Sequence, residues 1–288
     1  MSTPTLMPAA FIGHGSPMNT FEDNRYTRAW RSFASTVPHP RAVLVVSAHW
    51  YTSVTAITAM AAPRTIHDLY GFGPRLESFQ YPCPGSPEIA REVREVLKPR
   101  YLGLDNDAWG LDHGAWSVLA NMFPNADVPV LQLSVNGTKD FDYHVDIGSR
   151  LSPLRERGIL IIASGNVLHN LARAKGAMKD TAFDWGVRFN EAAKELMTTN
   201  PAEAATLRAH PDFGKAAEAP DHFIPLLYLA GLAKAVGRSP KLLVDGYAMG
   251  TLSMASYILD AECPQPQSTD TTGSHELPAD VPPDQTNM

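Results

Sequence analysis

The segment Ala42-Val43-Leu44-Val45-Val46-Ser47-Ala48-His49-Trp50 gives the clearest fold signal in the chain. Its apolar first half predicts a buried strand over residues 42–46, and a histidine follows shortly after. A second apolar run, at residues 9–12, is followed by Gly13 and His14. Ligands of open α/β sheets bind beyond the carboxyl ends of the strands. A histidine at each of two strand ends is therefore a candidate metal ligand or acid/base group.

Further strand-like and helix-like segments alternate along the chain. Additional strands are predicted over residues 54–59, 128–135, 158–163, 241–244 and 252–258. Helices are predicted over residues 86–97, 114–122, 141–152, 167–175, 181–198 and 222–236. Ser86, followed by proline and an acid, is a helix-capping signal at the first of these. The alternation predicts an α/β fold, with a central mixed sheet flanked by helices.

The domain organisation follows from changes in composition. Residues 1–261 are interpreted as one catalytic domain, and residues 262–288, rich in Pro, Ser and Thr, as a disordered tail. Within the domain, residues 62–85 combine prolines, glycines and aromatic residues, which predicts a long irregular loop. Such a loop is either a lid over a binding site or a purely structural Ω-loop, and the sequence leaves both interpretations open.

Composition also excludes several classes of partner. The formal net charge is −6 and no long basic run occurs, so duplex nucleic acid is excluded. No segment approaches the ~20 apolar residues of a membrane span, and the first residues do not resemble a signal peptide. Cys83 and Cys263 form no disulfide framework and no metal-binding motif. We expect a cytoplasmic protein without a membrane or nucleic-acid partner.

Two more histidines fit the chemistry of the first pair. His169 follows another predicted strand, and His222 lies in Asp221-His222-Phe223. His14, His49 and His222 would supply three metal ligands from separate elements and leave an open side for substrate. The structural alternatives are that His169 lies in a helix and that Asp221 is simply a helix N-cap.

The remaining histidines divide into two groups. His113, next to Asp112, either faces a substrate or merely follows a capping residue. For His67 the structural interpretation is preferred. We predict that the other four lie on the surface: His39, His144, His210 and His275.

Seven motifs, in this order, carry a family resemblance. They are Gly13-His14-Gly15-Ser16-Pro17-Met18, Ser47-Ala48-His49-Trp50, Ile66-His67-Asp68-Leu69-Tyr70-Gly71-Phe72, Tyr81-Pro82-Cys83-Pro84-Gly85, Asp112-His113-Gly114-Ala115-Trp116, Gly165-Asn166-Val167-Leu168-His169-Asn170 and Asp221-His222-Phe223. Together they resemble the class III extradiol ring-cleaving dioxygenases, in the DOPA 4,5-dioxygenase-like branch. The same superfamily includes the catalytic subunit of protocatechuate 4,5-dioxygenase. The resemblance spans about residues 9–258.

The resemblance implies a metal centre with His14, His49 and His222 as ligands. It implies His169 as the acid/base group, or as a fourth ligand where members of the branch bind zinc. The protocatechuate enzyme has a carboxylate as its third ligand, so an all-histidine set departs from the usual iron site. We expect Fe(II) for catalysis, with Zn(II) as the alternative occupant of the same site.

The implied reaction opens a catechol-type ring outside the diol, using a small aromatic diol and dioxygen in aromatic compound catabolism. We predict His113 as a second catalytic histidine, and substrate contacts from His113, Trp116 and Tyr70. Arg64 and Arg75 could bind a substrate carboxylate but are preferred as surface residues.

Two other functions use the same residues. One is a zinc-dependent hydrolase or lyase, since zinc cannot supply the electron transfer of an oxygenase. The other is a non-enzymatic binding protein of the Memo type, which the complete histidine set disfavours.

Overall fold

The central strands are buried on both faces. Every residue of β1 (Ala9–Gly13) is buried, and its alternate side chains enter two separate hydrophobic cores. The same holds for the first part of β2 (Ala42–Thr52). A continuous apolar run is what a parallel strand between two helical layers requires. The computed structural model describes residues 6–263.

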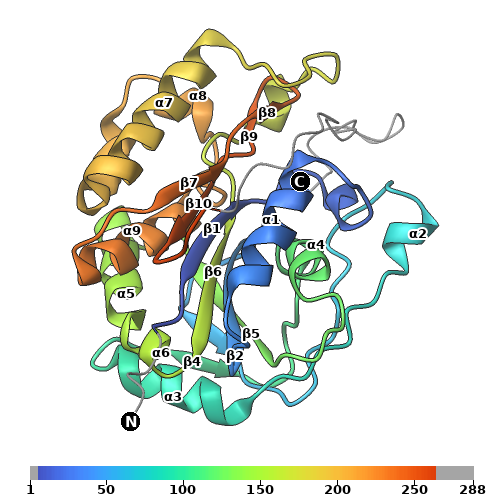
Figure 1. The fold of residues 1–288 in the computed structure, drawn as a ribbon, viewed down its shortest axis with the longest axis vertical. Coiled ribbons are helices and arrows are strands. Elements are labelled where there is room, and N and C mark those ends of the chain that lie inside the picture. The colour runs from blue at the N-terminus through green and yellow to red at the C-terminus, as the bar shows by residue number, and fades with distance from the viewer. Residues whose placement is uncertain (1–5, 264–288) are drawn as a thin grey trace.

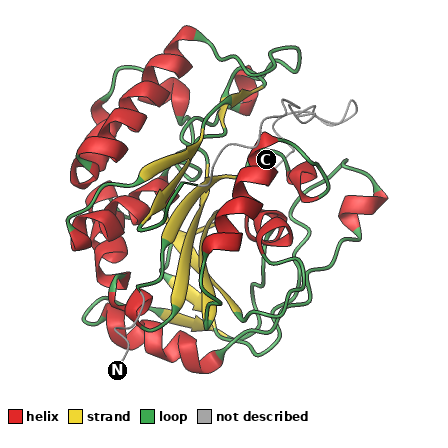
Figure 2. Ribbon diagram, viewed as in Figure 1, coloured by secondary structure: helices red, strands yellow, loops and turns green. Residues whose placement is uncertain are grey.

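The main sheet is mixed, as the sequence predicts, and has eight strands (Figure 2). Its order is β4-β3-β5-β2-β6-β1-β10-β7. The other strands are β3 (Ala56–Thr58), β4 (Gly103–Asp105), β5 (Val130–Asn136), β6 (Ile159–Gly165), β7 (Lys241–Val244) and β10 (Ser256–Leu259). The four central strands, β5, β2, β6 and β1, run parallel, whereas β3 and β10 pair antiparallel with them. A separate two-stranded sheet joins β8 (Tyr247–Ala248) to β9 (Leu252–Ser253).

Helices cover both faces of the sheet (Figure 1). One face packs against α1 (Arg25–Thr36) and α4 (His113–Met122). The other packs against α3 (Pro87–Leu97), α5 (Phe141–Leu151), α7 (Asp184–Thr199) and α9 (Ile224–Val236). The short helices are α2 (Pro74–Glu77), α6 (Pro153–Glu156), α8 (Phe213–Ala216), η1 (Pro17–Thr20), η2 (Leu171–Arg173) and η3 (Pro201–Ala209). The architecture is an α/β domain.

Helix α3 begins where its capping signal predicts. The Ser86 side chain accepts a hydrogen bond from the Ile89 backbone N–H, with a distance of 3.2 Å. Asp112 caps α4 in the same way, through the Ala115 N–H at 3.2 Å. The capping interpretation of Asp112 is therefore confirmed, and it sets the position of His113 as the first residue of α4.

Some predicted elements are wrong. Residues 167–175 do not form a helix, because their backbone bonds to neighbouring segments instead: His169 forms bridges with Ala217 and Leu252, and only η2 is helical. The predicted strand at 252–258 is divided into β9 and β10. Helix α1 and strand β4 were not predicted.

The long loop and the tail have different outcomes. Residues 62–85 are irregular, as predicted, apart from the single turn α2. The predicted tail lies outside the described residues beyond Cys263. Among residues 6–263, no helix has the length and apolar content needed to cross a membrane.

Candidate active site

The site forms where the carboxyl ends of β1, β6 and β2 meet. His14 follows β1 directly, and its backbone N–H donates to Gly165 O at the end of β6, at 3.1 Å. A Cβ atom at Gly165 would lie 2.2 Å from the backbone oxygen of His222. Glycine is therefore needed for the His222 segment to reach this edge, where Asn166 N–H donates to His222 O at 2.9 Å.

His49 lies inside a strand and not beyond its end. Strand β2 continues past the predicted limit at residue 46 and ends at Thr52. Its pairing with β6 stops at Ser47, and its register with β5 shifts between Val46 and Tyr51. This irregular part of the strand turns His49 toward the end of β1, a common effect of a local register shift.

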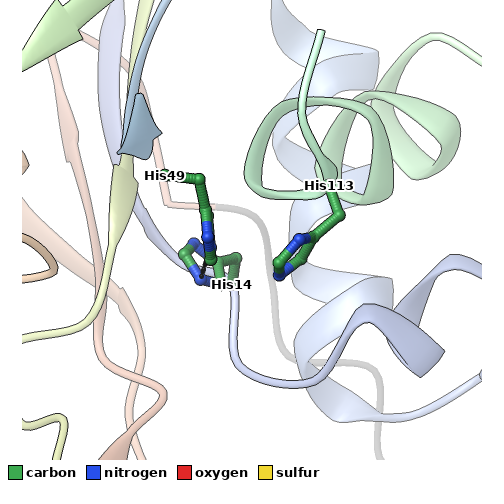
Figure 3. Close-up of side chains that lie close together, drawn as sticks. All are labelled: His14, His49 and His113. Atoms are coloured by element: carbon green, nitrogen blue, oxygen red, sulfur yellow. Dashed lines mark hydrogen bonds between the residues drawn. The ribbon is translucent and has the colours of Figure 1, made fainter. Parts of the chain in front are cut away.

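Five histidines gather at this edge: His14, His49, His113, His169 and His222. The Nε2 atoms of His14 and His49 are 3.3 Å apart. The His222 ring centroid lies 5.3 Å from that of His14 and 4.9 Å from that of His49. His113 is closest to His49, at 3.9 Å between centroids, and Figure 3 shows its ring facing the first pair. His169 stacks on His222 at 3.6 Å with nearly parallel planes.

The two histidines closest to the sheet are neutral. Burial, together with repulsion from the neighbouring histidines, lowers the pKa of His14 and of His49 well below the ordinary value. In a neutral imidazole one ring nitrogen carries a proton and the other carries a lone pair, and the nitrogen with the lone pair can bind a metal.

The serine at the end of β6 fixes which nitrogen of His14 carries the proton. Ser164 Oγ donates its hydrogen to Gly114 O at 2.6 Å, so it can only accept from His14 Nδ1, which lies 2.9 Å away. Nε2 of His14 therefore presents its lone pair to the site. Oriented partners on the outer ring nitrogen are typical of metal-binding histidines.

Carboxylates stand behind the other rings. Asp68 Oδ2 lies 3.6 Å from His49 Nδ1, and Asp221 Oδ1 lies 3.3 Å from His222 Nδ1. Burial raises the pKa of Asp221, but attraction to His222 and His169 outweighs burial and lowers it. Burial also raises the pKa of Asp68, but the interaction with His113 outweighs burial, so this pKa is lowered as well. Both carboxylates face the outer nitrogens, so they support the rings instead of competing for the central position.

The donor set fits a divalent metal, and two histidines compete for the third position. Judged by ring nitrogens, His14, His49 and His113 all lie within 4.8 Å of one another. Judged by ring placement, His222 fits better. A metal–nitrogen bond of about 2.1 Å, with ligand angles of about 90–110°, separates ring centroids by roughly 4.6–5.3 Å. The centroids of His14 and His49 are 5.1 Å apart, and that of His222 lies 5.3 Å from His14 and 4.9 Å from His49. The centroid of His113 lies 3.9 Å from that of His49 and 6.2 Å from that of His14. Ring placement favours His222 as the third ligand, because nitrogen separations change when a ring rotates in place whereas centroid separations do not.

A buried polar network lies beneath the site. Asp112 accepts from Ser47 Oγ at 2.7 Å and from the side-chain amide of Gln132. Burial and the charge of Asp68 raise the pKa of Asp112 to about 6. A Cβ at Gly114 would lie 2.6 Å from Ser47 Oγ and 2.7 Å from the His49 ring, so this glycine admits the His49 ring.

The predicted substrate contacts have contrasting environments. Trp116 is fully buried and donates from Nε1 to Ile66 O at 2.9 Å, with its ring 6.3 Å from that of His113. Tyr70 is 68% exposed, in the long loop. Their contacts with substrate stay predictions.

The other histidines and arginines are mostly placed as expected. His67 Nε2 donates to Phe79 O at 2.8 Å, which supports its structural interpretation. His39 is exposed and His210 is half-buried. Arg64 and Arg75 are both exposed. His275 lies outside the described residues.

The prediction for His144 is wrong. This histidine is fully buried between α5 and α9, and its Nδ1 lies 3.1 Å from the Tyr228 hydroxyl. Its polar neighbours in sequence suggested a surface position, but it occupies the same face of α5 as Phe141 and Val145.

Sequence and structure comparisons identify relatives over nearly all of the chain. Residues 8–258 match the family described as the catalytic LigB subunit of aromatic ring-opening dioxygenase. A protein of Escherichia coli K12 named 4,5-DOPA dioxygenase extradiol is 45% identical, covering 88% of this chain and 94% of that protein. A Beta vulgaris protein of the same name is 33% identical, covering 86% and 94%. The crystal structure of an uncharacterized E. coli K12 protein superposes with a TM-score of 0.77 at 39% identity, covering 88% of this chain and 99% of that one.

Proposed function

The chain belongs to the family of the catalytic LigB subunit of aromatic ring-opening dioxygenases and is an extradiol ring-opening dioxygenase, and from this premise we propose its metal, substrate and catalytic residues. The metal is a divalent ion held by His14, His49 and His222. The substrate is a catechol-type diol, and L-DOPA is the first compound to test, because relatives carry that substrate in their names.

The observation that carries the proposal is the meeting of three imidazole rings at one point. His14 and His49 present Nε2 atoms 3.3 Å apart, and His222 completes a nearly equilateral triangle of ring centroids. Nε2 of His222 has no hydrogen-bond partner in the described structure although the ring is buried, whereas Nδ1 faces Asp221. Buried polar atoms without partners are costly, and a bound metal would satisfy them.

When bound, iron(II) would chelate the diol, lower the pKa of its hydroxyl groups and bring dioxygen to the ring. The residues of the chain supply the remaining functions. His113 and His169 flank the triad on two sides, His113 beside His49 and His169 stacked on His222. We assign to them the transfer of protons from the diol and back to the product, a role that typically contributes ~10²–10⁴ in rate.

Zinc remains the alternative metal because all three proposed ligands are histidines, as in many catalytic zinc sites. Zinc would direct the site to hydrolase or lyase chemistry. The test is to load metal-free protein anaerobically with iron(II) or zinc(II), and then add a catechol and oxygen. We expect oxygen uptake and a yellow ring-fission product with iron only. Equal turnover with zinc, or cleavage between the two hydroxyl groups, would contradict the proposal.

Matched alanine variants separate the two candidates for the third ligand. His222→Ala should lose most of its bound metal, as His14→Ala and His49→Ala should, since each removes a ligand. His113→Ala should keep its metal and lose turnover. Metal content by elemental analysis decides the assignment, and the opposite pattern would move the third ligand to His113.

A further inference from the structure

One carboxylate lies between two of the site histidines. Asp68 Oδ1 is 2.9 Å from His113 Nδ1, and Oδ2 of the same group is 3.6 Å from His49 Nδ1. The backbone N–H of His113 donates to Oδ1 at 3.0 Å, so the carboxylate is also fixed to the first residue of α4. Its side chain is only 11% exposed.

We propose that Asp68 is a positioning residue that sets the tautomer and orientation of both His49 and His113. An ionised carboxylate accepts hydrogen bonds but cannot donate them. The Nδ1 atom that faces the Asp68 carboxylate therefore carries the proton, and in this tautomer the lone pair of each imidazole is on Nε2. This inference rests on the proposed function for its catalytic meaning, but the tautomers are a property of the chain itself.

The two rings use that lone pair for different purposes. For His49, Nε2 points toward the same position as Nε2 of His14, and these two nitrogen atoms are 3.3 Å apart. For His113, Nε2 has no hydrogen-bond partner in the described structure and can accept a proton. When a diol O–H bond breaks and the proton forms a new bond to Nε2, the imidazole becomes a cation. Asp68 then faces that cation directly, so the charge is stabilised as it develops.

Asp68 also gives the long loop a role. It lies within residues 62–85, whose sequence left open a binding loop or a structural one. The contacts of Asp68 connect this loop both to strand β2, through His49, and to the start of α4. The loop therefore contributes a supporting group to the site and is not merely a surface connection.

The experiment reads the tautomers directly, using the full chain loaded with zinc(II), labelled with ¹⁵N at histidine and measured by NMR. We expect His113 with its proton on Nδ1 and a free Nε2, and His49 with its proton on Nδ1. In Asp68→Asn the amide can donate to the ring, so the His113 signals should shift to the Nε2–H form. Zinc affinity, from competition with a chelator, should fall by ~10–100-fold, as is typical when such partners are removed.

Asp221→Asn is the matched control, since its carboxylate supports His222 and His169 and not His113. It should weaken zinc binding and leave the His113 tautomer unchanged. An Nε2–H form of His113 in the unmodified protein would overturn the proposal without any variant. So would an Asp68→Asn protein with unchanged signals and affinity. Failure to cleave catechols would instead contradict the proposed function and leave the tautomer result standing.

Discussion

At the scale of single residues, one hydroxyl group determines how His14 presents itself. We predict that Ser164→Ala lowers metal affinity by ~10-fold or more, because Nδ1 of His14 loses its acceptor and the ring loses its orientation. Ser134→Ala is the control. Ser134 is equally buried, and its hydroxyl bonds to two backbone groups, Ala56 N–H and Val54 O, and to no histidine in the described part of the chain.

Both serine variants should lose about 1–3 kcal/mol of unfolding free energy, since each leaves a buried N–H group without its acceptor: His14 Nδ1–H in Ser164→Ala and the Ala56 backbone N–H in Ser134→Ala. Chelator competition and urea unfolding measure the two effects. If the two variants bind metal equally well, Ser164 has no role in the site.

A glycine at the start of α4 gives a second test. Alanine normally stabilises a helix relative to glycine by about 1 kcal/mol. At Gly114 the added methyl group would press on Ser47 and the His49 ring, so Gly114→Ala should weaken metal binding despite that preference. Gly214→Ala in α8 is the control, because nothing lies within 4 Å of its added Cβ. Unchanged metal affinity in Gly114→Ala would show that His49 tolerates displacement.

At the scale of elements, the packing of α5 on α9 carries a pH-dependent contribution to stability. Burial lowers the pKa of His144 to about 4. Between that value and the ordinary one near 6.5, the unfolded chain binds a proton that the folded chain does not. The contribution is therefore complete above about pH 6.5 and is lost as the pH falls toward 4.

We predict that the unfolding free energy of the natural chain falls by about 2 kcal/mol more than that of His144→Gln between pH 7 and pH 5. Glutamine does not titrate, so the difference isolates this one side chain from the site histidines. Urea unfolding at the two pH values measures it. Parallel pH dependence in the two proteins would mean that His144 titrates normally.

The elements were predictable where a single local signal decides them. The buried strands β1 and β6 and the capped helix α3 follow from the apolar runs and from Ser86. Helix α1 has polar residues over most of its length, and its buried stripe of Tyr26, Trp30 and Phe33 is narrow. The segment at His169 has apolar spacing like a helix, but bonds with other segments hold it extended. Local preference was overruled there by tertiary contacts.

At the scale of the whole molecule, Arg155 connects the two ends of the described chain. Its guanidinium is fully buried, with Nε donating to Met7 O at 2.7 Å and Nη2 to Asp260 Oδ2 at 2.6 Å. These contacts lie at the amino end of β1, opposite the site. They hold the start of the first strand against the end of the last.

We predict that Arg155→Met costs about 2 kcal/mol of unfolding free energy, because the Asp260 carboxylate keeps Arg238 but loses its buried partner, and Met7 O loses its side-chain donor. Arg157→Met is the control: its side chain is 47% exposed and pairs with Glu92 on the surface, so the cost should stay below about 1 kcal/mol. Metal affinity should be unchanged in both. Equal stability of the two variants would contradict a role for the buried pair.

The candidate ligands were predictable, whereas their partners were not. His14, His49, His169 and His222 follow from their positions near strand ends and from the family motifs, and all four lie at the site. Ser164 Oγ lies 2.9 Å from the outer nitrogen of His14 and Asp68 Oδ2 lies 3.6 Å from that of His49, and neither pairing could be inferred from the sequence. The sheet order brings Ser164 in β6 beside the segment after β1, and the path of the long loop brings Asp68 to β2, so neither contact is encoded in local sequence.

The spacing of the five histidines along the chain affects when the metal site can form. They begin at residue 14 and end at residue 222, each on a different segment, so no fragment shorter than residues 14–222 contains the full set. A growing polypeptide would complete the centre only after the segment of α9 has left the ribosome and docked against β6. An ion captured there binds the native state and not its precursors. It therefore adds its binding free energy to the whole fold, by RT ln(1 + [metal]/Kd).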